Sequence, residues 1–340
     1  MSEFSDVLYD ASTDTYYTRG TEFVYTLIAG DHQLQIPFKH MDVYPEAGVI
    51  EKPVLLTPIF HPCYAHGFED AMALFNYKYH HLKSVSRDIV LSFMNITKHY
   101  LPPGWIPPEN NIDKSTWTYK IPTYNEFIKF LSNEPPIWEC KREPKLYLYR
   151  RLFIVDKHLA YTPNNSPSSW TNGTRNLQVF PNEKMRNWMF LFRDEIKRFY
   201  EIPPATHSRN LFIHRSSNRR LRDSSIKTML QKIPDLELVC LENMSFRDQI
   251  LKVNDARLIV STHGAGLFNT IFCKEGATVI ELFPRPDARQ VIFPYYCAFL
   301  GHRFTTHISS TNTLDNHQWG EEFFDMNIDE VISCVLSHMH

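Results

Sequence analysis

The segment with the clearest capacity for chemistry is a turn near the C-terminus that contains one histidine and two glycines. It reads S-T-H-G-A-G over residues 261–266 and follows a short apolar run at 258–260. Residues 267–272 then place apolar side chains on one helical face. The pattern predicts strand, tight turn and helix. The first N–H groups of such a helix lack intrahelical partners and lie at its positive end, which suits a phosphate.

A cluster of arginines follows another predicted strand, at residues 210–214. Arg215 comes directly after this strand, and Arg219 and Arg220 lie one helical turn further. A solvated basic face is the ordinary interpretation of such a run. If both strands belong to one parallel sheet, however, Arg215 and the His263 turn share its carboxyl edge, where α/β proteins bind ligands. The guanidinium fork suits a diphosphate, so the cluster predicts an anion site.

Glu281 stands near the end of a second buried strand, predicted over residues 277–282. Its carboxylate could accept hydrogen bonds from a ribose diol at the same edge of the sheet. The alternative is a structural glutamate that caps an element or forms a salt bridge. The sequence leaves both interpretations open.

Several enzyme classes are disfavoured by missing motifs. Asn269 stands where the third glycine of G-x-G-x-x-G would be, which argues against a nicotinamide enzyme. Neither a P-loop nor G-x-S-x-G occurs, which argues against P-loop NTPases and α/β-hydrolases. H-E-x-x-H and a D-x-D metal clamp are also missing, so no metal is expected.

The elements that would position these residues divide the chain into two α/β halves. Buried strands are predicted at 54–56, 87–94 and 145–155, after short peripheral strands in the first 50 residues. A long helix at 182–200 ends at Pro203-Pro204, where we expect the domain boundary. Strands then alternate with helices, which predicts a parallel, right-handed, doubly wound sheet. The expected divisions are 1–203, 204–320 and a last segment, 321–340.

The composition predicts a soluble protein without a strong electrostatic partner. The 340 residues carry 36 Lys plus Arg against 38 Asp plus Glu, a net charge of −2, so neither nucleic-acid binding nor membrane insertion is expected. The first ten residues do not resemble a signal peptide, which favours the cytoplasm; the ER or Golgi lumen is the alternative if the chain is part of a secretory enzyme. Six cysteines without CxxC spacing predict reduced core thiols.

The C-terminal motifs resemble those of glycosyltransferase family 61. The resemblance rests on H-G-A-G-L-x-N followed by a strand that ends in E-x-F-P, together with the arginines before and residues 295–304 after. In the N-terminal half, residues 65–75 are similar to the family's H-x-x-x-D segment in His66 and Asp70. The family includes plant β-1,2-xylosyltransferases and animal O-linked N-acetylglucosaminyltransferases.

The resemblance implies a GT-B architecture, in which two Rossmann-like domains face a cleft, and an inverting, metal-independent enzyme. The donor would be a UDP-sugar, with xylose favoured and N-acetylglucosamine next, and the acceptor a hydroxyl of a glycan or glycoprotein. The last helix would pack back on the first domain with Val331, Ile332 and Leu336 facing the core. The nucleotide-binding residues implied are Arg215, Arg219, Arg220, His263, Gly264, Ala265, Gly266, Leu267, Asn269 and Glu281.

Such an enzyme needs a base for the acceptor hydroxyl, and the candidates are Asp70, Glu69 and His66. His66 and Asp70 are four residues apart, so on one helix they would share a face as a base and its orienting partner. Alternatively, Glu69 and Asp70 only complement the helix dipole. A second class of function also stays open, a catalytically silent nucleotide- or glycan-binding module of the same fold.

Overall fold

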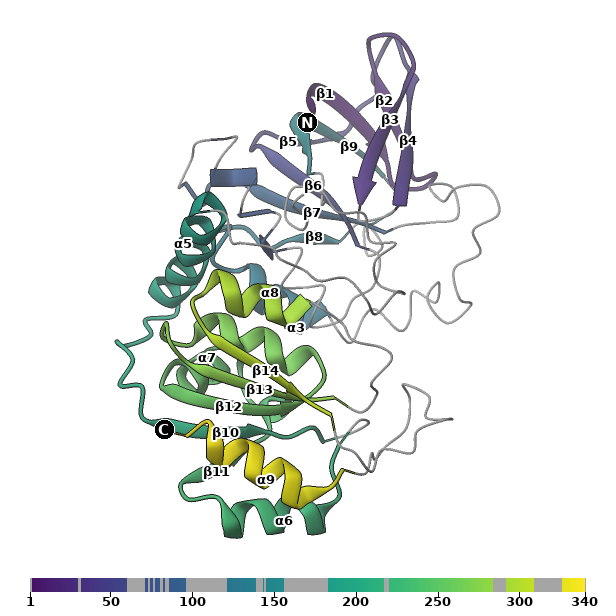
Figure 1. Ribbon diagram of the computed structural model, residues 1–340. Coiled ribbons are helices and arrows are strands. Elements are labelled where there is room, and N and C mark those ends of the chain that lie inside the picture. Colours follow the sequence, from purple (N-terminus) through teal and green to yellow (C-terminus); the bar gives the residue numbers. More distant parts are fainter. Residues whose placement is uncertain are drawn as a thin grey trace. The chain divides into compact units, whose positions relative to one another are not determined.

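The chain folds as a mixed α/β protein that divides into two compact units, residues 1–167 and 168–340. Figure 1 shows the computed structural model. The structure describes residues 2–29, 32–59, 71–72, 74–75, 77–79, 82, 86–95, 121–138, 143, 145–155, 183–216, 220–283, 292–308 and 326–339. The described residues form two β-sheets, one in each unit, and the sheet of the second unit is entirely parallel.

The parallel sheet of the second unit has the strand order β11-β10-β12-β13-β14. Its strands are β10 (Arg209–Ile213), β11 (Leu236–Val239), β12 (Ala256–Thr262), β13 (Thr278–Leu282) and β14 (Arg303–His307). All five residues of β13 are buried, as expected for a strand covered on both faces. Because β10 pairs with β11 on one side and with β12 on the other, the direction in which successive strands are added to the sheet reverses between β10 and β12. Such a switch point opens a crevice at the carboxyl ends of the strands.

Helices connect these strands in the alternation that the sequence predicts. They are α6 (Asp223–Lys232), η5 (Leu241–Asn243), α7 (Phe246–Asn254), η6 (Ala265–Phe272), α8 (Ile292–Phe299) and, after the last strand, α9 (Ile328–Ser337). Figure 1 shows α6 and α9 on one face of the sheet and α7 and α8 on the other. The segment after the His263 turn is a 3₁₀ helix, η6, and not the α-helix that its apolar pattern suggested.

The C-terminal helix α9 buries its apolar face in the second unit. Val331 and Val335 belong to one core cluster with Val260 and Ile280 of the sheet and with residues of α6. The buried face of α9 therefore packs within the second unit, whereas the sequence predicted that this helix packs on the first domain. The register of the apolar stripe also differs, because Leu336 is 37% exposed while Val335 is buried. An amphipathic stripe specifies a buried face but not its partner.

Helix α5 (Glu183–Phe199) groups with the second unit, although the boundary predicted at residue 203 lies after it. Its buried side chains include Trp188, Phe192 and Ile196, which recur at helical spacing. The helix contacts α8 and η6, two elements of the second unit. These contacts explain why the division lies before the helix.

The first unit contains a mixed sheet of nine strands, in the order β3-β4-β2-β1-β9-β6-β7-β8 with β5 beside β9. The strands are β1 (Ser2–Asp10), β2 (Thr15–Thr18), β3 (Phe23–Ala29), β4 (His32–His40), β5 (Gly48–Ile50), β6 (Val54–Ile59), β7 (Val90–Asn95), β8 (Ile137–Trp138) and β9 (Leu146–Ile154). Helix α3 (Ile121–Ile128) and helical residues 71–72, 74–75 and 77–79 accompany it.

Only part of this sheet matches the Rossmann-like domain expected from the sequence. Strands β9, β6, β7 and β8 run parallel in that order. In contrast, β1 pairs antiparallel with β2 and β9, and β3 pairs antiparallel with β4. The strands at 2–10 and 32–40 are also longer than the short peripheral strands predicted. Stacked aromatic rings hold this antiparallel part together, with Phe38 4.9 Å from Phe4 and 4.6 Å from Phe23 between centroids.

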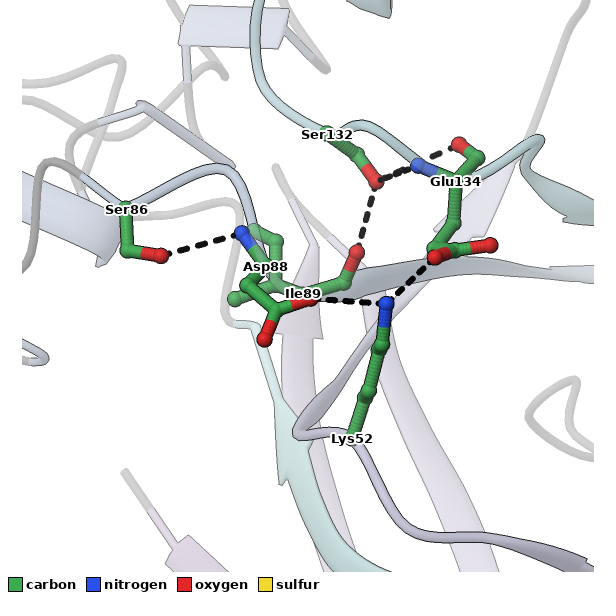
Figure 2. A network of polar contacts seen from close by, with 6 residues as sticks. All are labelled: Lys52, Ser86, Asp88, Ile89, Ser132 and Glu134. Carbon is green, nitrogen blue, oxygen red and sulfur yellow. Dashed lines mark hydrogen bonds and ion pairs between the residues drawn. The ribbon is translucent and has the colours of Figure 1, made fainter.

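A polar network ties together the amino ends of β6, β7 and β8 (Figure 2). Lys52 Nζ lies 2.7 Å from a carboxylate oxygen of Asp88 and also contacts Glu134. Ser132 Oγ donates to the carbonyl of Ile89 at 2.6 Å and accepts from the Glu134 N–H at 2.9 Å. Ligands of parallel sheets bind at the carboxyl ends, so this network at the amino ends is structural.

Replacing Ser132 with Ala is expected to lower the free energy of unfolding by about 1–2 kcal/mol, because the buried carbonyl of Ile89 and the partly buried N–H of Glu134 lose a partner. Chemical denaturation measures this change. Ser86→Ala is the control, since Ser86 is exposed and accepts one N–H bond in the same network. Equal stability of the two variants would contradict a role for the buried hydroxyl.

Candidate functional site

The switch point between β10 and β12 brings Arg215 and the glycine turn together, as the sequence predicts. The two residues follow parallel strands whose last paired residues are Ile213 and Ser261. A Cβ atom on Gly264 would collide with Nη1 of Arg215. The guanidinium therefore lies directly against the backbone of the turn, which only a glycine permits at this distance.

Arg215 is a half-buried cation at this edge. Burial lowers the pKa of Arg215, and the negative charge of Glu242 opposes this shift. The guanidinium still remains protonated, as arginine does in proteins. Glu242 also holds the loop after β10, because one of its carboxylate oxygens accepts the N–H of Ser216 at 3.0 Å. A partly desolvated cation beside a helix N-terminus favours an anionic ligand.

His263 and Glu281 form a buried pair beneath the turn. Nδ1 of His263 lies 2.5 Å from Oε1 of Glu281, and the two residues are 3% and 1% exposed. Thr306, the register partner of Glu281 on β14, donates its hydroxyl to Oε2 at 3.4 Å. The rings of Phe283 and Phe293 pack edge-on against the imidazole at 4.7 and 5.5 Å.

Glu281, the predicted ribose-binding residue, is almost completely buried. Its two carboxylate oxygens bond to His263 and Thr306, inside the protein. These contacts agree with the alternative that the sequence left open, a structural glutamate, and the ribose-binding role stays a prediction. Thr306 was missed by sequence reasoning, and only the pairing of β13 with β14 reveals it.

The remaining residues of the turn divide into buried and partly exposed groups. Leu267 and Asn269 are fully buried, and Asn269 Nδ2 donates to the carbonyl of Gly266 at 3.2 Å, which closes the turn. Ala265 and Gly266 are partly exposed at the start of η6. Their N–H groups are the ones that the helix terminus can offer to an anion.

Replacing Gly264 with Ala is expected to weaken binding of a diphosphate, because the new methyl group displaces the Arg215 guanidinium. We expect a loss of about fivefold, which is ~1 kcal/mol. Isothermal titration measures the affinity. Gly266→Ala is the matched control, since its Cβ would lie 3.3 Å from Ile213 Cγ2 and needs only a small adjustment. A Gly264→Ala protein that binds as tightly as the control would contradict this geometry.

The other predicted anion-binding arginine that the structure describes is Arg220. It is partly buried just before α6, with Nη1 3.6 Å from Asp223. Arg219 lies outside the described residues, and so do the three candidates for the base, His66, Glu69 and Asp70. The helix expected after them is present, with Leu74 and the neighbouring apolar residues buried.

Within the described ranges, no group of three or more His, Cys, Asp or Glu side chains is arranged to hold a metal ion. The cysteines described there, Cys240, Cys273, Cys297 and Cys334, are free thiols. None of the helices in these ranges has the length and apolar character that a membrane span requires.

Comparisons with known proteins agree with the resemblance that the motifs indicate. The family model "Glycosyltransferase 61" matches residues 49–280, more than half of the chain. Human and chimpanzee protein O-linked-mannose beta-1,4-N-acetylglucosaminyltransferase 2 are each 50% identical to this chain over 46 residues, 14% of this chain and 8% of theirs. The mouse protein of that name is 29% identical over 113 residues, 32% of this chain and 19% of its own.

The matched stretches thus span less than a fifth of those relatives. These proteins are therefore distant homologues of this chain, whereas the family match extends over parts of both units. The chain belongs to glycosyltransferase family 61.

Proposed function

We propose that this protein is an inverting glycosyltransferase that transfers a sugar from a UDP-sugar to a hydroxyl group of a glycan or glycoprotein. The observation that carries the proposal is the contact of Arg215 with Gly264 at the switch point of the parallel sheet. The diphosphate would lie over the start of η6, where Arg215 and the N–H groups of Ala265 and Gly266 converge. Arg219 and Arg220 are further candidates for binding the negatively charged diphosphate.

The proposed reaction is a single displacement. The acceptor oxygen attacks the anomeric carbon from the face opposite the nucleotide while the bond to the UDP oxygen breaks, and UDP leaves with the electron pair. A base takes the proton of the acceptor hydroxyl, and Asp70 is our candidate. The charge that develops on UDP would be stabilised by Arg215 and the helix terminus, which are already in place before the reaction.

Family membership supports a GT-B architecture for this reaction, with the donor on the second unit and the base supplied by the first. The parallel half of the first sheet, β9-β6-β7-β8, is compatible with it. For the sugar, the names of the matched relatives support N-acetylglucosamine, ahead of the xylose favoured from the sequence. The acceptor stays a hydroxyl of a glycan or glycoprotein.

Incubation with a panel of UDP-sugars tests this function. We expect slow release of UDP without acceptor, fastest with UDP-N-acetylglucosamine, and transfer when glycan acceptors are added. UDP-xylose is the second arm of the panel. Tight binding without any turnover would favour the silent binding module, and the absence of both would overturn the proposal.

We further propose that catalysis needs no metal ion. The arginines and the start of η6 would neutralise the leaving diphosphate, as in electrostatic catalysis generally. Activity is therefore expected to persist in excess EDTA. A complete loss that added manganese restores would contradict this prediction.

A further inference from the structure

The parallel sheet ends in a row of four residues, three of them polar, on the face covered by α6 and α9. Thr262 pairs with Leu282, and Leu282 pairs with His307. His214 follows Ile213, the partner of Ser261, so it aligns with Thr262. The row across the sheet is therefore His214, Thr262, Leu282 and His307.

Alternation along the strands fixes the face of this row. Phe212, Val260 and Ile280, two residues earlier on their strands, belong to the core cluster with α6 and α9. His214 also lines a cavity of about 370 Å³ with side chains of α6 and with Leu238. The row thus lies across the sheet from the His263–Glu281 pair, at the same carboxyl edge.

Each of the three polar members has a buried atom without a hydrogen-bond partner among the residues that the structure describes. These atoms are Nδ1 of His214, Oγ1 of Thr262 and Nε2 of His307, and Thr262 is only 1% exposed. A buried polar group that stays unsatisfied costs about 1–3 kcal/mol, so each needs an explanation. Three of them in one register row, at the edge where such sheets bind ligands, point to a ligand that supplies the missing bonds.

The chemistry of the row fits hydroxyl groups better than phosphate. Burial lowers the pKa of His214, with a further contribution from the charge of Arg220, and burial also lowers the pKa of His307. Both imidazoles are therefore neutral at neutral pH and offer one donor or acceptor per nitrogen. A threonine hydroxyl both donates and accepts. Neighbouring strands are about 4.8 Å apart, so His214 and Thr262 can each reach one oxygen of a vicinal diol.

We propose that His214 and Thr262, extended by His307, bind the vicinal hydroxyl groups of the donor substrate. This inference rests on the proposed function, which places a nucleotide-sugar at this edge. It adds the row to the candidate donor-binding residues, because both oxygens of Glu281 already have partners within the protein. The hydroxyls belong either to the ribose or to the transferred sugar.

Thr262→Val is the decisive variant, because valine keeps the branched shape and removes only the hydroxyl. We expect its melting temperature to be unchanged or higher, since a buried unsatisfied group is lost. Its affinity for UDP-N-acetylglucosamine, which carries both sets of hydroxyl groups, should fall about five- to tenfold, while its affinity for inorganic pyrophosphate stays at the wild-type value. The control is Thr278→Val, because Thr278 has the same kind of buried, unpartnered hydroxyl at the amino end of β13.

The source of the hydroxyls follows from comparing ligands by titration calorimetry. If the ribose is bound, the difference between wild type and Thr262→Val appears with UDP and disappears with 2′-deoxy-UDP or 3′-deoxy-UDP. If the transferred sugar is bound, the difference appears only with UDP-N-acetylglucosamine. If both valine variants bind all these ligands with wild-type affinity, the inference is wrong and the proposed function is unaffected. A wild-type protein that binds none of them overturns the proposed function as well.

Discussion

Asp70→Asn is expected to lower turnover by roughly 10²–10⁴ while leaving donor affinity unchanged. Asparagine keeps the size and much of the hydrogen-bonding shape of the side chain but cannot take the proton of the acceptor hydroxyl. Asp70 lies outside the described residues, so this prediction rests on its place in the H-x-x-x-D segment. Turnover is measured with saturating donor and acceptor, and donor affinity by calorimetry.

Two further experiments test whether the loss of turnover reflects the loss of a catalytic base. Glu69→Gln alters the neighbouring carboxylate in the same chemical way and should retain most of the activity. NMR of the product tests inversion separately, because a retained anomeric configuration excludes a single displacement. Near-native turnover of the Asp70→Asn protein would move the role of base to Glu69 or His66.

Arg215→Ala is expected to weaken UDP binding by at least tenfold. A hydrogen bond to a charged group contributes about 1.5–3 kcal/mol, and tenfold corresponds to about 1.4 kcal/mol. Arg209→Ala is the matched control, because Arg209 lies at the opposite end of the same strand in an ion pair with Glu237. Equal affinities of the two variants, measured by calorimetry at one ionic strength, would contradict a phosphate role for Arg215.

The parallel sheet of the second unit could be predicted because the sequence patterns that indicate it are local, each within one strand, helix or turn. Apolar strands such as β12 and β13 alternate with helical segments, and Arg215 and Gly264 directly follow strands of one sheet. The carboxyl edge of a parallel sheet then brings such residues together without further information.

The parts that could not be predicted depend on long-range pairing. In the first unit, β1 pairs with β9, far away in the sequence, and nothing local indicates that this pairing is antiparallel. The bond between Glu281 and His263 and the position of Thr306 depend on how β13 aligns with its neighbours. The partner of α9 was equally open, because its apolar stripe fits any complementary surface.

A crystal structure of the protein with bound UDP would locate the donor site. We predict that the diphosphate lies within hydrogen-bond distance of the Arg215 guanidinium and of the N–H groups of Ala265 and Gly266, with the ribose at the carboxyl edge of β10 and β12. UDP bound at the amino ends of these strands, or on the first unit without contact to Arg215, would contradict it.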